Sequence, residues 1–148
     1  MNYIIYTDGS CKPDVGKASY SYIIRTDKTC VKIAYSCYYG DHILDAEIAA
    51  VRESLRYMVE NRRLNNGDKV KFFIDSLFTL KAYSALFKGE PLPDDVKPEL
   101  VDSAIPILKD AMKTGAKFYF NKIDAHQDKF NTNKVCDCLA KLALTYSM

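Results

Sequence analysis

The order of strand-like and helix-like segments is the feature that most restricts how this chain can fold. Strand character appears first in three closely spaced segments, and then in two segments that each follow a helical pattern, at residues 3–8, 17–26, 29–39, 69–75 and 116–124. Helical patterns cover residues 45–63, 76–89, 97–115 and 133–146. The order predicts an antiparallel meander followed by right-handed parallel crossovers. The expected fold class is therefore α/β, with a five-stranded mixed sheet and helices on both faces.

Single residues predict where several helices begin and end. Asp45 is a candidate N-cap for the first long helix, because its side chain can accept a backbone N–H there. Gly89 is placed to close the second helix. Pro106 lies inside the third helical pattern, so we expect that helix to be kinked or divided.

Composition is that of an ordinary globular protein. The chain has 148 residues, of which 48% are hydrophobic and 27% charged, so we expect a single domain over residues 1–148. The formal net charge of +2 neither indicates nor excludes a polyanionic partner. No apolar run approaches the ~20 residues of a membrane span, and the N-terminus lacks the pattern of a signal peptide. We expect a monomeric, cytoplasmic protein that does not bind membranes.

The five cysteines do not form the pattern of a disulfide framework or a zinc site. They are odd in number and scattered, and the Cys136-x-Cys138 pair has no second Cys or His pair near it. Reduced thiols are the simpler interpretation, in keeping with a cytosolic protein.

Two carboxylates stand where apolar strands end, and two more stand near helix starts. Asp8 follows the first strand-like segment and Asp75 follows the fourth. If these strands are parallel neighbours, both side chains emerge at the edge where open sheets bind ligands. Glu47 lies in the first turn of the first long helix, and Asp137 lies in the second turn of the last one. We expect these four carboxylates to converge at that edge.

Each of these residues also has an ordinary explanation. Glu47 is favoured near a helix N-terminus by the helix dipole, Asp75 can cap the following helix, and Asp137 and His126 can be solvated surface residues. Taken together, however, clustered carboxylates are costly unless a cation lies among them. Mg²⁺ prefers such oxygen ligands, and two divalent ions ~4 Å apart can promote phosphodiester cleavage.

The stretches that carry these residues resemble the type 1 ribonuclease H family. The resemblance spans nearly the whole chain and rests on "YTDGSC" at 6–11, "AEIAAVRESL" at 46–55, "FFIDS" at 72–76 and "AHQDKFNTNKVCDCLAKLA" at 125–143. It implies hydrolysis of the RNA strand of an RNA–DNA hybrid with two Mg²⁺ ions, or Mn²⁺ in their place. It further implies that His126 moves a proton near the leaving group. The metal-binding residues implied by the resemblance are Asp8, Glu47, Asp75 and Asp137.

The resemblance also implies a set of residues near the substrate. Gly9 is expected to let backbone and nucleic acid approach closely, and Ser10 and Cys11 are expected to lie by the minor groove, where 2′-hydroxyls distinguish RNA from DNA. The full expected set is Gly9, Ser10, Cys11, Lys12, Ser76, Asn133 and Lys134.

Several positions depart from the family pattern. Two asparagines that often precede the helical glutamate are replaced by Ile43 and Leu44, a glutamine after the strand-four aspartate is replaced by Leu77, and a glutamate in the last helix is replaced by Lys134. The connection at 88–95 is acidic and the chain has no Trp, whereas some members carry a basic, Trp-bearing protrusion there. These changes alter the residues expected to contact substrate and leave the carboxylates intact.

Other functions remain open at this stage. A nuclease of the same fold that acts on DNA or structured nucleic acid would use the same carboxylates. A non-catalytic nucleic-acid-binding module would be expected to lack at least one of them. Sugar kinases and actin-like ATPases share the core of the fold but need two such domains, which 148 residues cannot supply.

Overall fold

The structure is a computed structural model that describes residues 1–40, 43–123 and 132–146, with the side chains of 132–134 and 143–146 outside that description. The strands are β1 (Asn2–Lys12), β2 (Lys17–Arg25), β3 (Cys30–Tyr39), β4 (Lys69–Ile74) and β5 (Lys117–Lys122). The α-helices are α1 (Ile43–Glu60), α2 (Leu77–Lys88), α3 (Pro98–Val101), α4 (Ile105–Lys113) and α5 (Thr132–Tyr146). Two short 3₁₀ segments are η1 (Pro13–Val15) and η2 (Asp102–Ala104).

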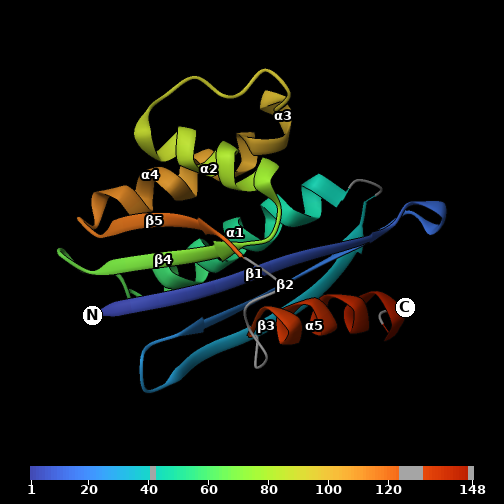
Figure 1. Cartoon of the computed structure of the whole chain (residues 1–148), viewed down its shortest axis with the longest axis horizontal. Helices are drawn as coiled ribbons and strands as arrows, with labels where there is room; N and C mark the ends of the chain where they lie inside the picture. The colour runs from blue at the N-terminus through green and yellow to red at the C-terminus, as the bar shows by residue number, and fades with distance from the viewer. Residues whose placement is uncertain (41–42, 124–131, 147–148) are drawn as a thin grey trace.

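The strands form one five-stranded sheet in the order β3-β2-β1-β4-β5 (Figure 1). β1 pairs with β2, and β2 with β3, in antiparallel fashion. β1 pairs with β4, and β4 with β5, in parallel fashion. The predicted mixed sheet, with a meander followed by parallel crossovers, is therefore confirmed.

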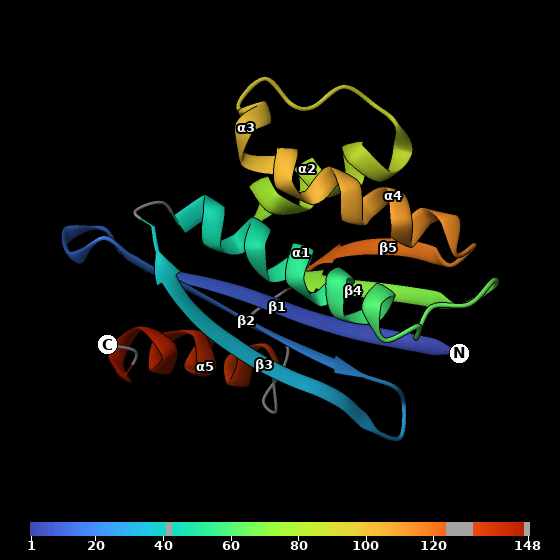
Figure 2. The ribbon, with the colours of Figure 1, turned by 180° about the vertical axis from the view of Figure 1, so that it is seen from behind.

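Helices cover both faces of this sheet. Figure 2 shows α1 on one face and α5 on the other, with α2, α3 and α4 on the side of β4 and β5. The core on the α1 face follows from strand alternation, because side chains two residues apart point to the same side. Residues that are completely buried there include Ile5, Ile24, Ile48, Leu55 and Phe72.

The first strand is longer than the sequence predicts. We expected it to end at Asp8, but its pairing with β2 continues to Lys12, which lies opposite Lys17. Its pairing with β4 stops earlier, at Thr7 opposite Ile74. Asp8 is thus the first residue of β1 beyond the parallel neighbour, which leaves it at the edge of the sheet although the strand goes on.

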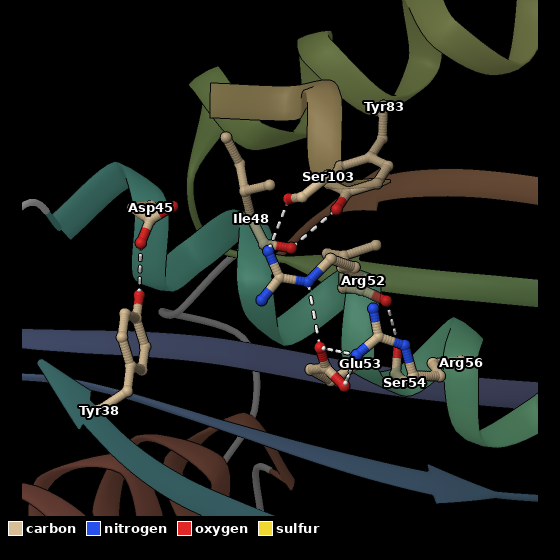
Figure 3. A network of polar contacts seen from close by, with 10 residues as sticks. Tyr38, Asp45, Ile48, Arg52, Glu53, Ser54, Arg56, Tyr83 and Ser103 are labelled. Atoms are coloured by element: carbon tan, nitrogen blue, oxygen red, sulfur yellow. Dashed lines mark hydrogen bonds and ion pairs between the residues drawn. The ribbon is translucent and has the colours of Figure 1, made fainter. Parts of the chain in front are cut away.

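The first long helix begins earlier than predicted, and Asp45 is not its N-cap. α1 starts at Ile43, so Asp45 already lies in the first turn. Its Oδ2 accepts a hydrogen bond of 2.9 Å from the hydroxyl of Tyr38 on β3. The side chain therefore joins the helix to the sheet rather than to its own backbone (Figure 3).

Further polar contacts hold α1 against neighbouring helices. The buried Tyr83 hydroxyl of α2 donates to the Ile48 carbonyl at 2.7 Å, and Arg52 Nη1 donates to the Ser103 hydroxyl at 2.8 Å (Figure 3). Glu53 accepts from both Arg52 and Arg56. Of these contacts, the one to the Ile48 carbonyl lies beside Glu47 in the sequence.

The end of α2 and the division of the third helical pattern follow the prediction, whereas the N-cap of α2 is Ser76 and not Asp75. Ser76 caps α2 by accepting from the Thr79 N–H at 3.2 Å, and Gly89 ends that helix in the left-handed conformation, with φ of 69°. The third helical pattern is divided into α3, η2 and α4, and Pro106 lies in the first turn of α4, where it loses no helical hydrogen bond.

Candidate metal centre

Asp8 and Asp75 lie at the same level of two adjacent parallel strands. Thr7 is paired with Ile74, and each aspartate is the next residue in its strand or just after it. Asp8 is only 5% exposed, whereas Asp75 is exposed. The Asp75 charge raises the pKa of both Asp8 and Glu47, so the three side chains share one electrostatic environment.

Glu47 reaches this edge because α1 lies very close to β1. A Cβ on Gly9 would be 2.6 Å from the Glu47 nitrogen, so no other residue fits without displacing the helix. The Gly9 N–H donates to Asp8 Oδ1 at 2.9 Å, and its dipole also lowers the pKa of Glu47. We expected Gly9 to admit nucleic acid, but it is buried and admits α1 instead. Because α1 begins at Ile43, Glu47 lies in the second turn of the helix and not in the first.

Asp137 approaches from the opposite face of the sheet on α5. Its side chain hydrogen-bonds to Asp8. Its Oδ2 also forms an ion pair with Lys141 Nζ, one turn later in the helix, at 2.9 Å. Partial burial raises the pKa of Asp137, but the hydrogen bonds from Lys141 and Asp8 outweigh it, so the net direction is downward. Lys141 was not among the expected site residues, although its i+4 spacing from Asp137 is a recognisable pairing signal.

Burial raises the pKa of two of these carboxyls, Asp8 and Glu47, to neutral pH or above. Desolvation, followed by the hydrogen bond and charge of Asp137, raises the pKa of Asp8 to about 7. Desolvation, followed by the charge of Asp8, raises the pKa of Glu47 to about 9. The hydrogen bond between Asp8 and Asp137 raises the pKa of Asp8 and lowers that of Asp137. A cation among these groups would remove the cost of ionising them.

The donor set fits a hard divalent cation. Glu47 Oε2 is buried and has no hydrogen-bond partner in the described part of the chain, which leaves an acceptor available to a ligand. Among the described residues, no three Asp, Glu, His or Cys side chains are placed to bind one metal ion together. The carboxyl groups meet in pairs, Asp8 with Asp137 and Asp8 with Glu47. Metal binding requires the carboxyl groups to lose their protons.

The expected substrate-binding residues and His126 differ in how far the structure describes and exposes them. Ser10 and Cys11 are partly buried on β1 and Lys12 is exposed, while the Ser76 hydroxyl is engaged in capping α2. His126 lies outside the described residues, as do the side chains of Asn133 and Lys134. The metal-binding and substrate-binding roles of the whole set stay predictions.

A cavity of about 250 Å³ lies elsewhere, between α2 and β5. Its walls include Ser84, Phe87, Phe118 and Phe120, and the residues around it carry no carboxylate or imidazole. The cavity therefore has no part in the carboxylate chemistry.

Comparison with known families identifies the family of the chain. The family model described as RNase H matches residues 1–145. The chain belongs to the RNase H family. No curated protein matches it.

Solved RNase H structures have the same fold as this family member. RNase H1 from the halophilic archaeon Halobacterium salinarum has a TM-score of 0.72 at 16% identity, covering 98% of both chains. The N-terminal RNase H domain of rv2228c from Mycobacterium tuberculosis has a TM-score of 0.72 at 16% identity, covering 97% of this chain and 94% of that one. LC11-RNase H1, solved in complex with an RNA/DNA hybrid, has a TM-score of 0.73 at 18% identity, covering 97% and 96%.

Within the described residues, none of the helices combines the length and hydrophobicity that crossing a bilayer requires.

The stability of the metal-free protein should fall as pH rises from about 4 to about 9. Asp8 and Glu47 have folded-state pKa values of about 7 and about 9, above their ordinary values of 3.8 and 4.5, so the folded state binds their protons more tightly. The stability that this provides is complete below pH ~4 and is lost as pH passes each folded pKa. Urea unfolding in EDTA between pH 4 and pH 9 measures this change in the free energy of unfolding.

Mg²⁺ provides the control for that experiment. At ten times its Kd, Mg²⁺ should add ~1.4 kcal/mol to the free energy of unfolding by mass action. A metal-free protein whose stability does not change between pH 5 and pH 9, and does not respond to Mg²⁺, would contradict the carboxylate arrangement.

Proposed function

We propose that this protein is a divalent-metal-dependent endonuclease that hydrolyses the RNA strand of RNA–DNA hybrids. The observation that carries the proposal is that two buried carboxyls, Asp8 and Glu47, lie with two further aspartates at one edge of the sheet. Asp8 contacts Asp137 across one face, while Glu47 meets Asp8 from the other. Membership of the RNase H family supports the proposal.

The four carboxylates would hold Mg²⁺, with Mn²⁺ as a substitute. When bound, the metal ions supply an activated water and stabilise the leaving 3′ oxygen of the scissile phosphate. The protein itself fixes the ligands in place. Gly9 orients Asp8 through its N–H, and Lys141 holds Asp137 on the solvent side. Burial of Asp8 and Glu47 excludes bulk water from the inner part of the site.

His126 is proposed to move a proton at the leaving oxygen rather than to bind metal. Its unperturbed pKa of ~6.5 suits proton transfer near neutral pH. It lies in the sequence between β5 and α5, eleven positions before Asp137.

A cleavage assay on four matched substrates tests the proposal. End-labelled RNA–DNA hybrid, duplex RNA, duplex DNA and a four-way DNA junction are incubated with the protein in Mg²⁺ or in excess EDTA. We expect Mg²⁺-dependent cleavage of the RNA strand of the hybrid. Cleavage of the DNA substrates alone would favour a DNA nuclease of the same fold, and cleavage that persists in EDTA would exclude the metal mechanism.

Apolar side chains at the rim of the site should weaken discrimination for the hybrid. Ile43 is 44% exposed at the start of α1 and Leu77 is 47% exposed at the start of α2, where polar residues would offer hydrogen bonds. The combined change Ile43→Asn, Leu44→Asn and Leu77→Gln should lower KM for the hybrid roughly tenfold, since each new hydrogen bond contributes ~0.5–1.5 kcal/mol.

Steady-state KM for hybrid and for duplex RNA measures this effect. Met112→Gln is the matched control, because Met112 is 48% exposed on α4, away from the carboxylates. If neither variant changes KM or the preference for hybrid over duplex RNA, positions 43, 44 and 77 do not contribute to substrate recognition.

The grip on the phosphate backbone should also be weak. The connection between α2 and α3, at the top of Figure 1, carries the exposed Glu90, Asp94 and Asp95 instead of a basic protrusion. Each phosphate contact adds ~0.9 to the slope of log K against log salt on duplex DNA, and few contacts give a shallow slope. Hybrid binding measured between 50 and 200 mM salt should therefore change little. Tight binding of the hybrid at 200 mM salt would contradict this prediction, because it would require phosphate contacts that these residues do not provide.

A further inference from the structure

Two serines on β2 are completely buried beneath α5. Ser19 and Ser21 both have 0% exposure, and they alternate with the tyrosines that face α1. A buried hydroxyl is costly unless it is hydrogen-bonded. Both hydroxyls are bonded, and both bonds go to the backbone of the same helix.

The hydroxyls donate to carbonyls one turn apart on α5. Ser19 Oγ donates to the Ala140 carbonyl at 2.5 Å, and Ser21 Oγ donates to the Cys136 carbonyl. Ser21 Oγ also lies 2.9 Å from Cys136 Sγ, and Cys136 Sγ lies 3.6 Å from the Tyr6 carbonyl on β1. The start of α5 is thereby joined to both central strands.

The spacing of the two bonds fixes the direction and height of the helix. Residues two apart in a strand are separated by ~6.8 Å, and carbonyls four apart in a helix are separated by ~6 Å. The two serines and the two carbonyls therefore match only when α5 runs antiparallel to β2. A shift of one residue along the helix would break both bonds and turn a different side chain toward the sheet.

Ser21 is the serine next to the carboxylates. It is paired directly opposite Asp8 in the β1–β2 ladder, so the two side chains point to the same face. The carbonyl that it binds belongs to Cys136, the residue before Asp137, and Asp137 hydrogen-bonds to Asp8. Ser19 binds the helix one turn further on, beyond Asp137.

We propose that Ser21 is a positioning residue: its hydrogen bond to the Cys136 carbonyl sets the height and rotation of α5 at which Asp137 meets Asp8. The proposal rests on the proposed function in so far as these two aspartates bind metal. Ser21 itself touches neither metal nor substrate. Residues that orient metal ligands in this way typically change metal affinity or activity 10–100-fold when they are mutated.

The test compares Ser21→Ala with Ser54→Ala. Ser54 is equally buried, at 0% exposure, and donates to the Val51 carbonyl within α1, so its variant loses a buried hydrogen bond without affecting α5. Mg²⁺ affinity is measured by calorimetry, and kcat and KM are measured on the hybrid. Ser21→Ala should weaken Mg²⁺ binding and lower kcat, each ~10–100-fold, with KM unchanged, while Ser54→Ala changes neither.

A second readout does not depend on metal or activity. Amide hydrogen exchange of residues 135–140 in metal-free protein should be faster in Ser21→Ala than in Ser54→Ala. Ser21→Thr keeps the hydroxyl and should recover most of the Mg²⁺ affinity. Where a variant is unstable, all proteins are compared in the same stabilising osmolyte.

The outcomes separate the two proposals. Equal Mg²⁺ affinity in Ser21→Ala and Ser54→Ala, with equal exchange in α5, would overturn the positioning role. A wild type that does not cleave hybrid, but whose Mg²⁺ affinity still depends on Ser21, would count against the proposed function alone and support the positioning role.

Discussion

Asp8→Asn should lower the rate of hybrid cleavage at least ~10³-fold, which corresponds to about 4 kcal/mol in the activation barrier. Asp75→Asn should have an effect of the same order. An amide cannot replace a carboxylate as a charged metal ligand, and Asp8 is the residue that contacts both Glu47 and Asp137. The same substitution should stabilise the metal-free protein at pH 8 by up to about 4 kcal/mol, because the pKa of Asp8 is raised from 3.8 to about 7 and one pKa unit is about 1.4 kcal/mol.

A second buried aspartate gives a matched control. Asp68 is 6% exposed, close to the 5% of Asp8, but it accepts from the N-terminal ammonium at 3.1 Å and from the Asn65 N–H at 2.9 Å. Asp68→Asn should therefore cost about 2 kcal/mol of stability and leave kcat unchanged. Urea unfolding and single-turnover cleavage of both variants test this crossed pattern. Loss of activity in Asp68→Asn with full activity in Asp8→Asn would refute the assignment.

His126→Ala should reduce kcat by ~10²–10⁴-fold and leave Mg²⁺ affinity intact, because a proton-transfer group contributes to the rate and not to metal binding. Added imidazole should restore part of the activity. The pH–rate profile should lose the limb that reports a group near pH ~6.5.

The other histidine of the chain, His42, is the control for this prediction. His42→Ala should keep kcat within a few-fold of wild type, since no role in proton transfer is assigned to it. Calorimetry on His126→Ala is the deciding measurement. Loss of Mg²⁺ binding in that variant would mean that His126 is a ligand.

The sequence predicted the sheet because its signals are local and repeated. The alternation of strand and helix patterns, together with the handedness of crossovers, restricts the topology to few choices, and the order β3-β2-β1-β4-β5 is among them. Pro106 and Gly89 acted as expected for the same reason, since their effects depend on their own backbone.

Features that depend on contacts between distant segments were not predicted. Asp45 has the sequence context of an N-cap, but a hydrogen bond from Tyr38 engages its side chain instead. Gly9 was expected to admit nucleic acid, and only the packed structure shows α1 against it. Ser19 and Ser21 alternate with tyrosines as residues on a solvated face would, and no pattern in β2 alone shows that α5 covers them.

Crystals of the protein soaked with Mn²⁺, with and without a non-cleavable hybrid, test the central claim most directly through the anomalous signal of the metal. In the protein alone, we expect one anomalous peak for a Mn²⁺ ion bound by Asp8. With the hybrid present, we expect two peaks ~4 Å apart, surrounded by the four carboxylates Asp8, Glu47, Asp75 and Asp137. Asp8→Asn crystals treated in the same way should lack them. Anomalous peaks that lie away from these carboxylates, or no peak at all in crystals saturated with Mn²⁺ and hybrid, would contradict it.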